Sequence, residues 1–82
     1  MSISGLVITL TDDPAEALAA LTRVRVDGRF ELGERHRHVV PVVLQAASDI
    51  DAQEAVAWLS QLQGVRKVDV AYVKLADEAL AA

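Results

Sequence analysis

Two alanine-rich segments of helical period lie between aliphatic runs that have the composition of β-strands, and this order limits the chain to a few α+β folds. The runs cover residues 3–10, 39–46 and 65–75 and are rich in valine, isoleucine and leucine. Such runs are typical of strands in a sheet. The segment 29–34 alternates polar with apolar side chains, which predicts a fourth strand solvated on one face.

The first helical segment follows an Asp-Asp pair. Asp12 and Asp13 precede Pro14, and a proline at the first helical position loses no hydrogen bond because its N–H would be unpaired there. We interpret both aspartates as helix caps rather than as paired catalytic carboxylates. The helix is predicted to start at Pro14 and to continue through residues 15–24. Its larger apolar side chains are Leu18, Leu21 and Val24, with Ala17 and Ala20 beside them, and this stripe is expected to face the sheet.

The second helix is predicted over residues 52–63. Ser48, Asp49 and Asp51 are candidate caps, and Asp51, with Glu54 three residues later, resembles a capping box. Gly64 follows at the place of a left-handed C-terminal cap. Trp58 is expected at the rim of the core, beside an inner stripe of Ala55, Val56, Leu59 and Leu62.

These elements predict an α+β fold, a ferredoxin-like β-α-β-β-α-β two-layer plait with an antiparallel sheet of strand order 4-1-3-2 and both helices on one face. Residues 1–82 are expected to form a single domain, because a chain of this length has room for one thin core. Residues 76–82 are expected to be a frayed tail. Pro41 cannot donate to a strand ladder, so it predicts a bulge or irregular pairing.

The two-residue period of a strand predicts which side chains face the helices. If Leu6, Ile8 and Leu10 point at the helices, then Val68, Val70 and Tyr72 share that side. The opposite side then has aliphatic groups at its centre and acidic groups at its edges. Its predicted members are Gly5, Val7, Thr9, Val39, Pro41, Val43, Asp69, Ala71 and Val73, with Glu31, Gly33 and Arg35 from the second strand. An apolar patch with a polar rim commonly marks an interaction site, and a homodimer packed sheet to sheet is the alternative.

Composition excludes several classes of function. The net charge of −4 is the wrong sign for binding nucleic acid or an anionic membrane surface. The chain has no cysteine, and His36 and His38 lack further ligands at metal-binding spacing, so we expect no metal, no cofactor and no enzymatic activity. The N-terminal segment has no basic region, and aspartates soon interrupt its apolar run, which predicts a cytoplasmic protein.

Four features together carry a resemblance to one family. They are Ile3-Ser4-Gly5-Leu6-Val7 at the first strand, Val42-Val43-Leu44-Gln45 in the third, Gly64-Val65 after the second helix, and Tyr72 near the end of the fourth strand. From Ile3 to about Lys74 the chain resembles the NapD-like chaperones. The resemblance implies a cytoplasmic chaperone that binds the twin-arginine signal peptide of a periplasmic nitrate reductase and delays export until the molybdenum cofactor is inserted.

The residues are compatible with that role. We expect a signal peptide to fold as a short amphipathic helix over Val7, Val43, Ala71 and Val73, while Glu31 or Asp69 attracts its arginines. Two alternatives remain open at this point. One is a dimeric ferredoxin-like regulatory domain that binds a small molecule, and the other is a structural or assembly module.

Overall fold

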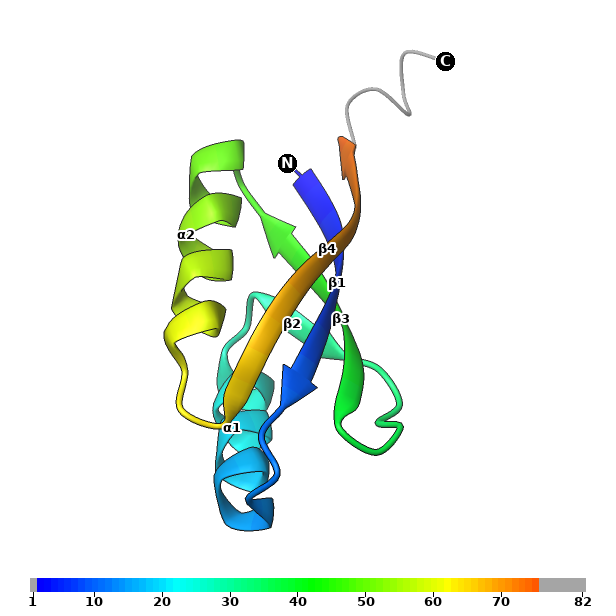
Figure 1. Cartoon of the computed structure of the whole chain (residues 1–82). Helices are drawn as coiled ribbons and strands as arrows, with labels where there is room; N and C mark the ends of the chain where they lie inside the picture. Colours follow the sequence, from blue (N-terminus) through cyan, green and yellow to red (C-terminus); the bar gives the residue numbers. More distant parts are fainter. Residues whose placement is uncertain (1, 76–82) are drawn as a thin grey trace.

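The computed structural model describes residues 2–75, with side chains described for residues 2–72. The elements in chain order are β1 (Ser2–Leu10), α1 (Pro14–Val26), β2 (Phe30–Leu32), β3 (Val39–Ala46), α2 (Asp49–Gln61) and β4 (Val65–Leu75) (Figure 1). The predicted element order is confirmed, and β3 and β4 have the predicted limits. α1 begins at Pro14 as predicted and ends two residues later than predicted, α2 begins and ends earlier than predicted, and β2 is shorter. The expected frayed tail, residues 76–82, lies outside the described residues.

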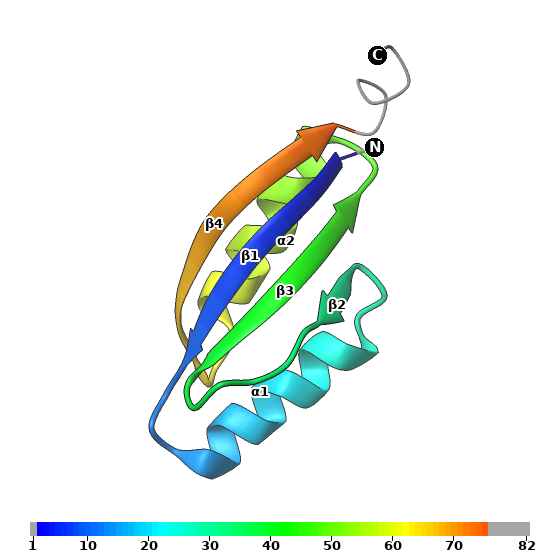
Figure 2. The ribbon, with the colours of Figure 1, turned by 90° about the vertical axis from the view of Figure 1, so that its right-hand side faces the viewer.

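The strands form one antiparallel sheet in the order β2-β3-β1-β4, which read from the β4 edge is 4-1-3-2. Figure 2 shows the sheet in front and both helices behind it. This two-layer α+β arrangement is compatible with a ferredoxin-like fold. None of the helices among residues 2–75 combines the length and the hydrophobicity needed to cross a bilayer.

The core lies between the sheet and the helices. Its fully buried side chains include Ile8 and Leu10 from β1, Leu44 from β3, Val24 from α1 and Leu59 from α2. On α1 the prediction for Leu18 is wrong, because this side chain is 64 % exposed. The buried positions of α1 are Ala17, Ala20, Leu21 and Val24. Ala17 and Ala20, which the sequence places beside the stripe, are thus confirmed as buried, together with Leu21 and Val24.

Side chains cap both helices, although not all of the predicted ones do so. The Asp13 carboxylate accepts hydrogen bonds from the backbone N–H groups of Ala15 at 2.9 Å and Glu16 at 3.3 Å. Asp12 instead lies 3.3 Å from Arg66. The capping box predicted at Asp51 is wrong, because α2 begins at Asp49 and Ser48 is its cap. The Ser48 hydroxyl accepts a hydrogen bond from the Asp51 N–H at 3.2 Å.

Pro41 occupies a regular position in β3, so the predicted bulge at this residue is wrong. It pairs with Val7 of β1 without a shift of register. Its carbonyl accepts a hydrogen bond from the Gly33 N–H at 2.8 Å. Because the N–H and C=O of one strand residue point to the same neighbouring strand, the missing N–H faces the β2 side. The ladder between β2 and β3 already ends at Leu32, so proline costs little there.

The irregular strand is β4, whose pairing with β1 shifts twice. In one shift, Leu6 pairs with Val70 and Gly5 with Tyr72, which leaves Ala71 as an extra residue. An extra residue reverses the alternation of side chains beyond it. Tyr72 therefore lies opposite an outward-facing residue, and its predicted orientation toward the helices is wrong.

The turn between α1 and β2 contains a two-contact ion pair. Two nitrogens of Arg29, Nε and Nη2, donate to the two oxygens of the Asp27 carboxylate at 2.9 and 2.8 Å. The Arg29 guanidinium also lies 5.3 Å from the ring centre of Phe30 and 5.4 Å from that of Trp58. Trp58 is partly buried and stacks on Phe30 at the edge of the core, as predicted.

Replacing Asp27 by asparagine should destabilise the protein at neutral pH by about 0.5 to 1 kcal/mol, since the pair is partly exposed. The hydrogen bond from Arg29 lowers the pKa of Asp27 below its ordinary value of 3.8. The stabilisation is therefore present above that value and is lost as the pH falls through the lowered pKa. Urea unfolding of both proteins at neutral pH and at about pH 2 checks this. If wild type and Asp27→Asn differ in the free energy of unfolding by the same amount at both pH values, this prediction is wrong.

Candidate functional site

The side of the sheet away from the helices, here called the open face, is organised as rows of paired residues across the strands. One row runs from β2 to β4 through Glu31, Val43, Gly5 and Tyr72. The next row runs through Gly33, Pro41, Val7 and Asp69. Each row thus has small or aliphatic residues at its centre, and each has an acidic residue at one end.

Four of the six predicted contact residues, Val7, Glu31, Val43 and Asp69, occupy these two rows. Val7 and Val43 are half-buried by their neighbours, whereas Glu31 and Asp69 are exposed. The face therefore has an aliphatic centre between carboxylates on opposite margins.

The other two predicted contact residues, Ala71 and Val73, lie near the β4 bulge between Val70 and Tyr72. Ala71 is the extra residue of that bulge and is exposed. Val73 pairs with Ser4, whose side chain is buried on the helix side, and the side chain of Val73 lies outside the described part of the chain.

Tyr72 is a member of the open face that the sequence prediction missed. A Cβ atom at Gly5 would collide with the Tyr72 ring, so the ring lies directly against the Gly5 backbone. The Tyr72 residue is nevertheless 52 % exposed. A glycine inside an aliphatic strand was the available signal, because such glycines often mark the close approach of another group.

Asp69 has a neighbour of opposite charge on its own strand. The Lys67 ammonium lies 3.5 Å from the Asp69 carboxylate, and both side chains are more than half exposed. Exposed ion pairs of this kind are weak, so Asp69 remains available to a cationic ligand that competes with Lys67.

No family model, curated protein or solved structure matches this chain.

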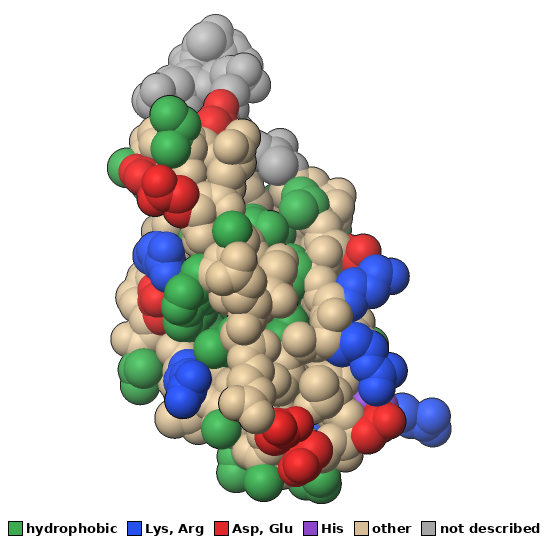
Figure 3. Space-filling view, turned by 60° about the vertical axis from the view of Figure 1, so that its left-hand side comes forward, with side chains coloured by type: hydrophobic (Ala, Val, Ile, Leu, Met, Phe, Trp, Pro, Cys, Tyr) green, Lys and Arg blue, Asp and Glu red, His purple; other side chains and the backbone are tan. Residues whose placement is uncertain are grey.

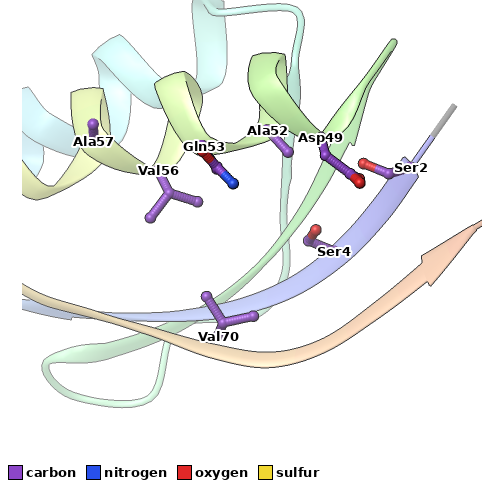
Figure 4. A pocket seen from close by; sticks show the side chains of 8 residues that line it. All are labelled: Ser2, Ser4, Asp49, Ala52, Gln53, Val56, Ala57 and Val70. Carbon is purple, nitrogen blue, oxygen red and sulfur yellow. The ribbon is translucent and has the colours of Figure 1, made fainter.

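A groove lies on the helix side of the sheet, between α2 and the strands β1 and β4. It has a volume of about 520 Å³ and is lined by Ser2, Ser4, Asp49, Ala52, Gln53, Val56, Ala57 and Val70. Figure 3 views the molecule from the side of α2, with hydrophobic side chains exposed through its middle. In Figure 4 the Val56 and Val70 side chains face each other across the groove. Val70 lies on the helix side, as the sequence pattern predicts, because it pairs with the buried Leu6, but it is 54 % exposed and borders the groove.

The two histidines of the β2–β3 connection have separate neighbours. His36 pairs with Val39 in an isolated bridge, and His38 lies 3.6 Å from the Asp12 carboxylate. Among the described residues, no three ligating side chains gather closely enough to hold a metal ion.

Proposed function

We propose that this protein is a cytoplasmic chaperone that binds the twin-arginine signal peptide of a molybdoenzyme precursor of the periplasmic nitrate reductase type. Binding holds back export until the cofactor has been inserted. The observation that carries the proposal is the open face, an uncovered aliphatic surface with carboxylates on two margins. The resemblance of the strand motifs to NapD-like chaperones supports the same function.

The dimensions of the open face suit one helical peptide. Glu31 and Asp69 lie on the two outer strands, which are three strand spacings or about 14 Å apart, and they are offset by two residues along the strands. An α-helix with its side chains is about 10 to 12 Å wide. A peptide helix can therefore lie on Val7 and Val43 while its arginines reach toward the margins.

The aliphatic centre should supply most of the affinity. Ordering a disordered peptide costs about 2 to 5 kcal/mol, and burial of apolar side chains is the interaction large enough to offset it. The exposed carboxylates at the margins contribute less, because water and salt screen them. Their role is to favour the orientation that brings arginines to the margins.

Calorimetric titration with a synthetic twin-arginine signal peptide tests the proposal directly. We expect saturable binding with one peptide per chain, and much weaker binding of a peptide of the same composition in scrambled order. A pull-down from the native cytoplasm should also recover an unexported precursor with its signal peptide. The absence of saturable binding would end the proposal.

The dimeric regulatory domain remains the second candidate, because the same aliphatic face could cover that of a second copy. Light scattering on the same sample separates the two. A dimer that persists on dilution and does not dissociate when peptide is added favours the regulatory domain.

Changing the two charged residues of β4 should shift peptide affinity in opposite directions. Lys67→Ala removes a cation 3.5 Å from Asp69 and should tighten binding by about 2- to 5-fold, whereas Asp69→Asn should weaken it by a similar factor. Arg23→Ala on α1 is the control, since it changes the net charge as Lys67→Ala does but lies on an exposed part of the helix layer. An equal gain in affinity for Arg23→Ala would show that net charge alone is responsible.

A further inference from the structure

We infer that Tyr72 and Asp69 form a subsite for one arginine side chain, with the Tyr72 ring as a stacking surface and the Asp69 carboxylate as the hydrogen-bond acceptor. The inference rests on the proposed function for the identity of the peptide that carries the arginine. It assigns a residue and a chemistry that the sequence pattern alone did not place on this face.

The β4 bulge and Gly5 together create the stacking surface. Because Ala71 is an extra residue, Tyr72 pairs with Gly5 and lies on the open face. Because Gly5 has no side chain, the ring can lie against the β1 backbone. One side of the ring is thus supported by the sheet, and 52 % of the residue remains exposed to a ligand.

Asp69 is within reach of the same arginine. It pairs with Val7, which is two residues from Gly5 along β1, so the two positions are about 7 Å apart along the strand. A guanidinium that stacks on the ring can direct its edge N–H groups toward a carboxylate at this separation. Stacking over an aromatic face combined with a two-contact bond to a carboxylate is a characteristic mode of arginine binding.

The same geometry discriminates against lysine. An ammonium group is compact and strongly hydrated, and it cannot offer a planar face and a two-contact edge at once. Lys67 already places an ammonium 3.5 Å from Asp69 at a single point. An arginine can displace this contact by adding the stacking contact with Tyr72, whereas a lysine of the peptide gains little over Lys67.

Two different substitutions should abolish the preference for arginine. Tyr72→Leu removes the ring and keeps an apolar side chain. Gly5→Ala leaves the ring in the protein but forces it away from the sheet, because the added Cβ would occupy its place. Since both changes act on one feature, their effects in the double variant should not add. Tyr72→Phe keeps the ring and is the matched control.

The experiment compares a twin-arginine peptide with its twin-lysine counterpart by calorimetry. We expect the wild type and Tyr72→Phe to prefer arginine by about 3- to 10-fold. Tyr72→Leu, Gly5→Ala and the double variant should each bind the two peptides within about 2-fold of one another. If Tyr72→Leu retains the full preference, the subsite is wrong while the proposed function stands.

A smaller probe decides the subsite without the peptide. N-acetyl-arginine amide, titrated to millimolar concentration, should cause saturable NMR shifts at the Tyr72 ring protons and the Gly5 amide, and Tyr72→Leu should remove the Gly5 shift. N-acetyl-lysine amide should cause smaller shifts. Failure of the peptide to bind would refute the proposed function, whereas absence of saturable arginine-amide shifts in the wild type would refute the subsite.

Discussion

Replacing Val7 by aspartate should nearly abolish signal-peptide binding and leave the protein folded. Val7 lies in the centre of the open face, between Pro41 and Asp69. A bound peptide would cover the new carboxylate, which would lose water without gaining a partner and would stand beside the charge of Asp69. We expect affinity to fall by about 100-fold, far more than for Asp69→Asn. Calorimetry of the variant with the twin-arginine peptide measures this loss.

Two variants separate this effect from a general loss of structure. Val7→Thr keeps the branched shape of valine and should bind within a few-fold of the wild type. Val26→Asp introduces the same charge at an exposed position on α1 and should leave binding unchanged. Circular dichroism should show folded protein in each case. Wild-type affinity for folded Val7→Asp would remove the open face from the binding site.

Replacing Gly64 by alanine should destabilise the protein by about 2 to 4 kcal/mol. Gly64 has a φ angle of 100°, which alanine rarely adopts. A Cβ atom there would also collide with the Glu16 carbonyl and lie 2.8 Å from the Ala20 Cβ. The turn after α2 therefore packs directly against the backbone of α1, and a methyl group would force the two apart. Urea unfolding gives the change in the free energy of unfolding.

Gly28→Ala is the matched control for this prediction. A Cβ atom at Gly28 would meet no other atom within 4 Å, so the substitution should change the free energy of unfolding by no more than about 0.5 kcal/mol. Equal stabilities for the two variants would show that the contact between Gly64 and α1 does not constrain the fold.

Local patterns in the sequence were sufficient to predict the regular elements. The limits of β3 and β4, the cap at Asp13 and the positive φ of Gly64 all agree with the structure. Each depends on residues within one turn or one strand, where side-chain period, cap chemistry and glycine flexibility act directly. The predicted role of Gly64 as the helix cap is wrong, because α2 ends at Gln61 and Leu62 is its C-cap.

Where two nearby residues could fill the same role, the sequence did not show which of them the structure uses. Ser48 and Asp51 are three residues apart, and either could cap a helix, but the structure uses Ser48. On α1 the sequence offers alanines and leucines at neighbouring positions, and Ala17 is buried while Leu18 is exposed. Docking of each helix on the sheet decides between such alternatives, because it selects the face that fits closest.

The sequence by itself determined the order of the elements and the aliphatic character of a sheet face that presents Val7 and Val43. Only the tertiary structure decided the position of Tyr72 and the groove between α2 and β4. The position of Tyr72 depends on the register between β1 and β4, which joins residues as distant in sequence as Gly5 and Tyr72, and the groove depends on how α2 packs beside β1 and β4. A single extra residue in β4 reverses the side of the sheet on which the following β4 side chains lie. No local pattern in either strand shows which residue is extra.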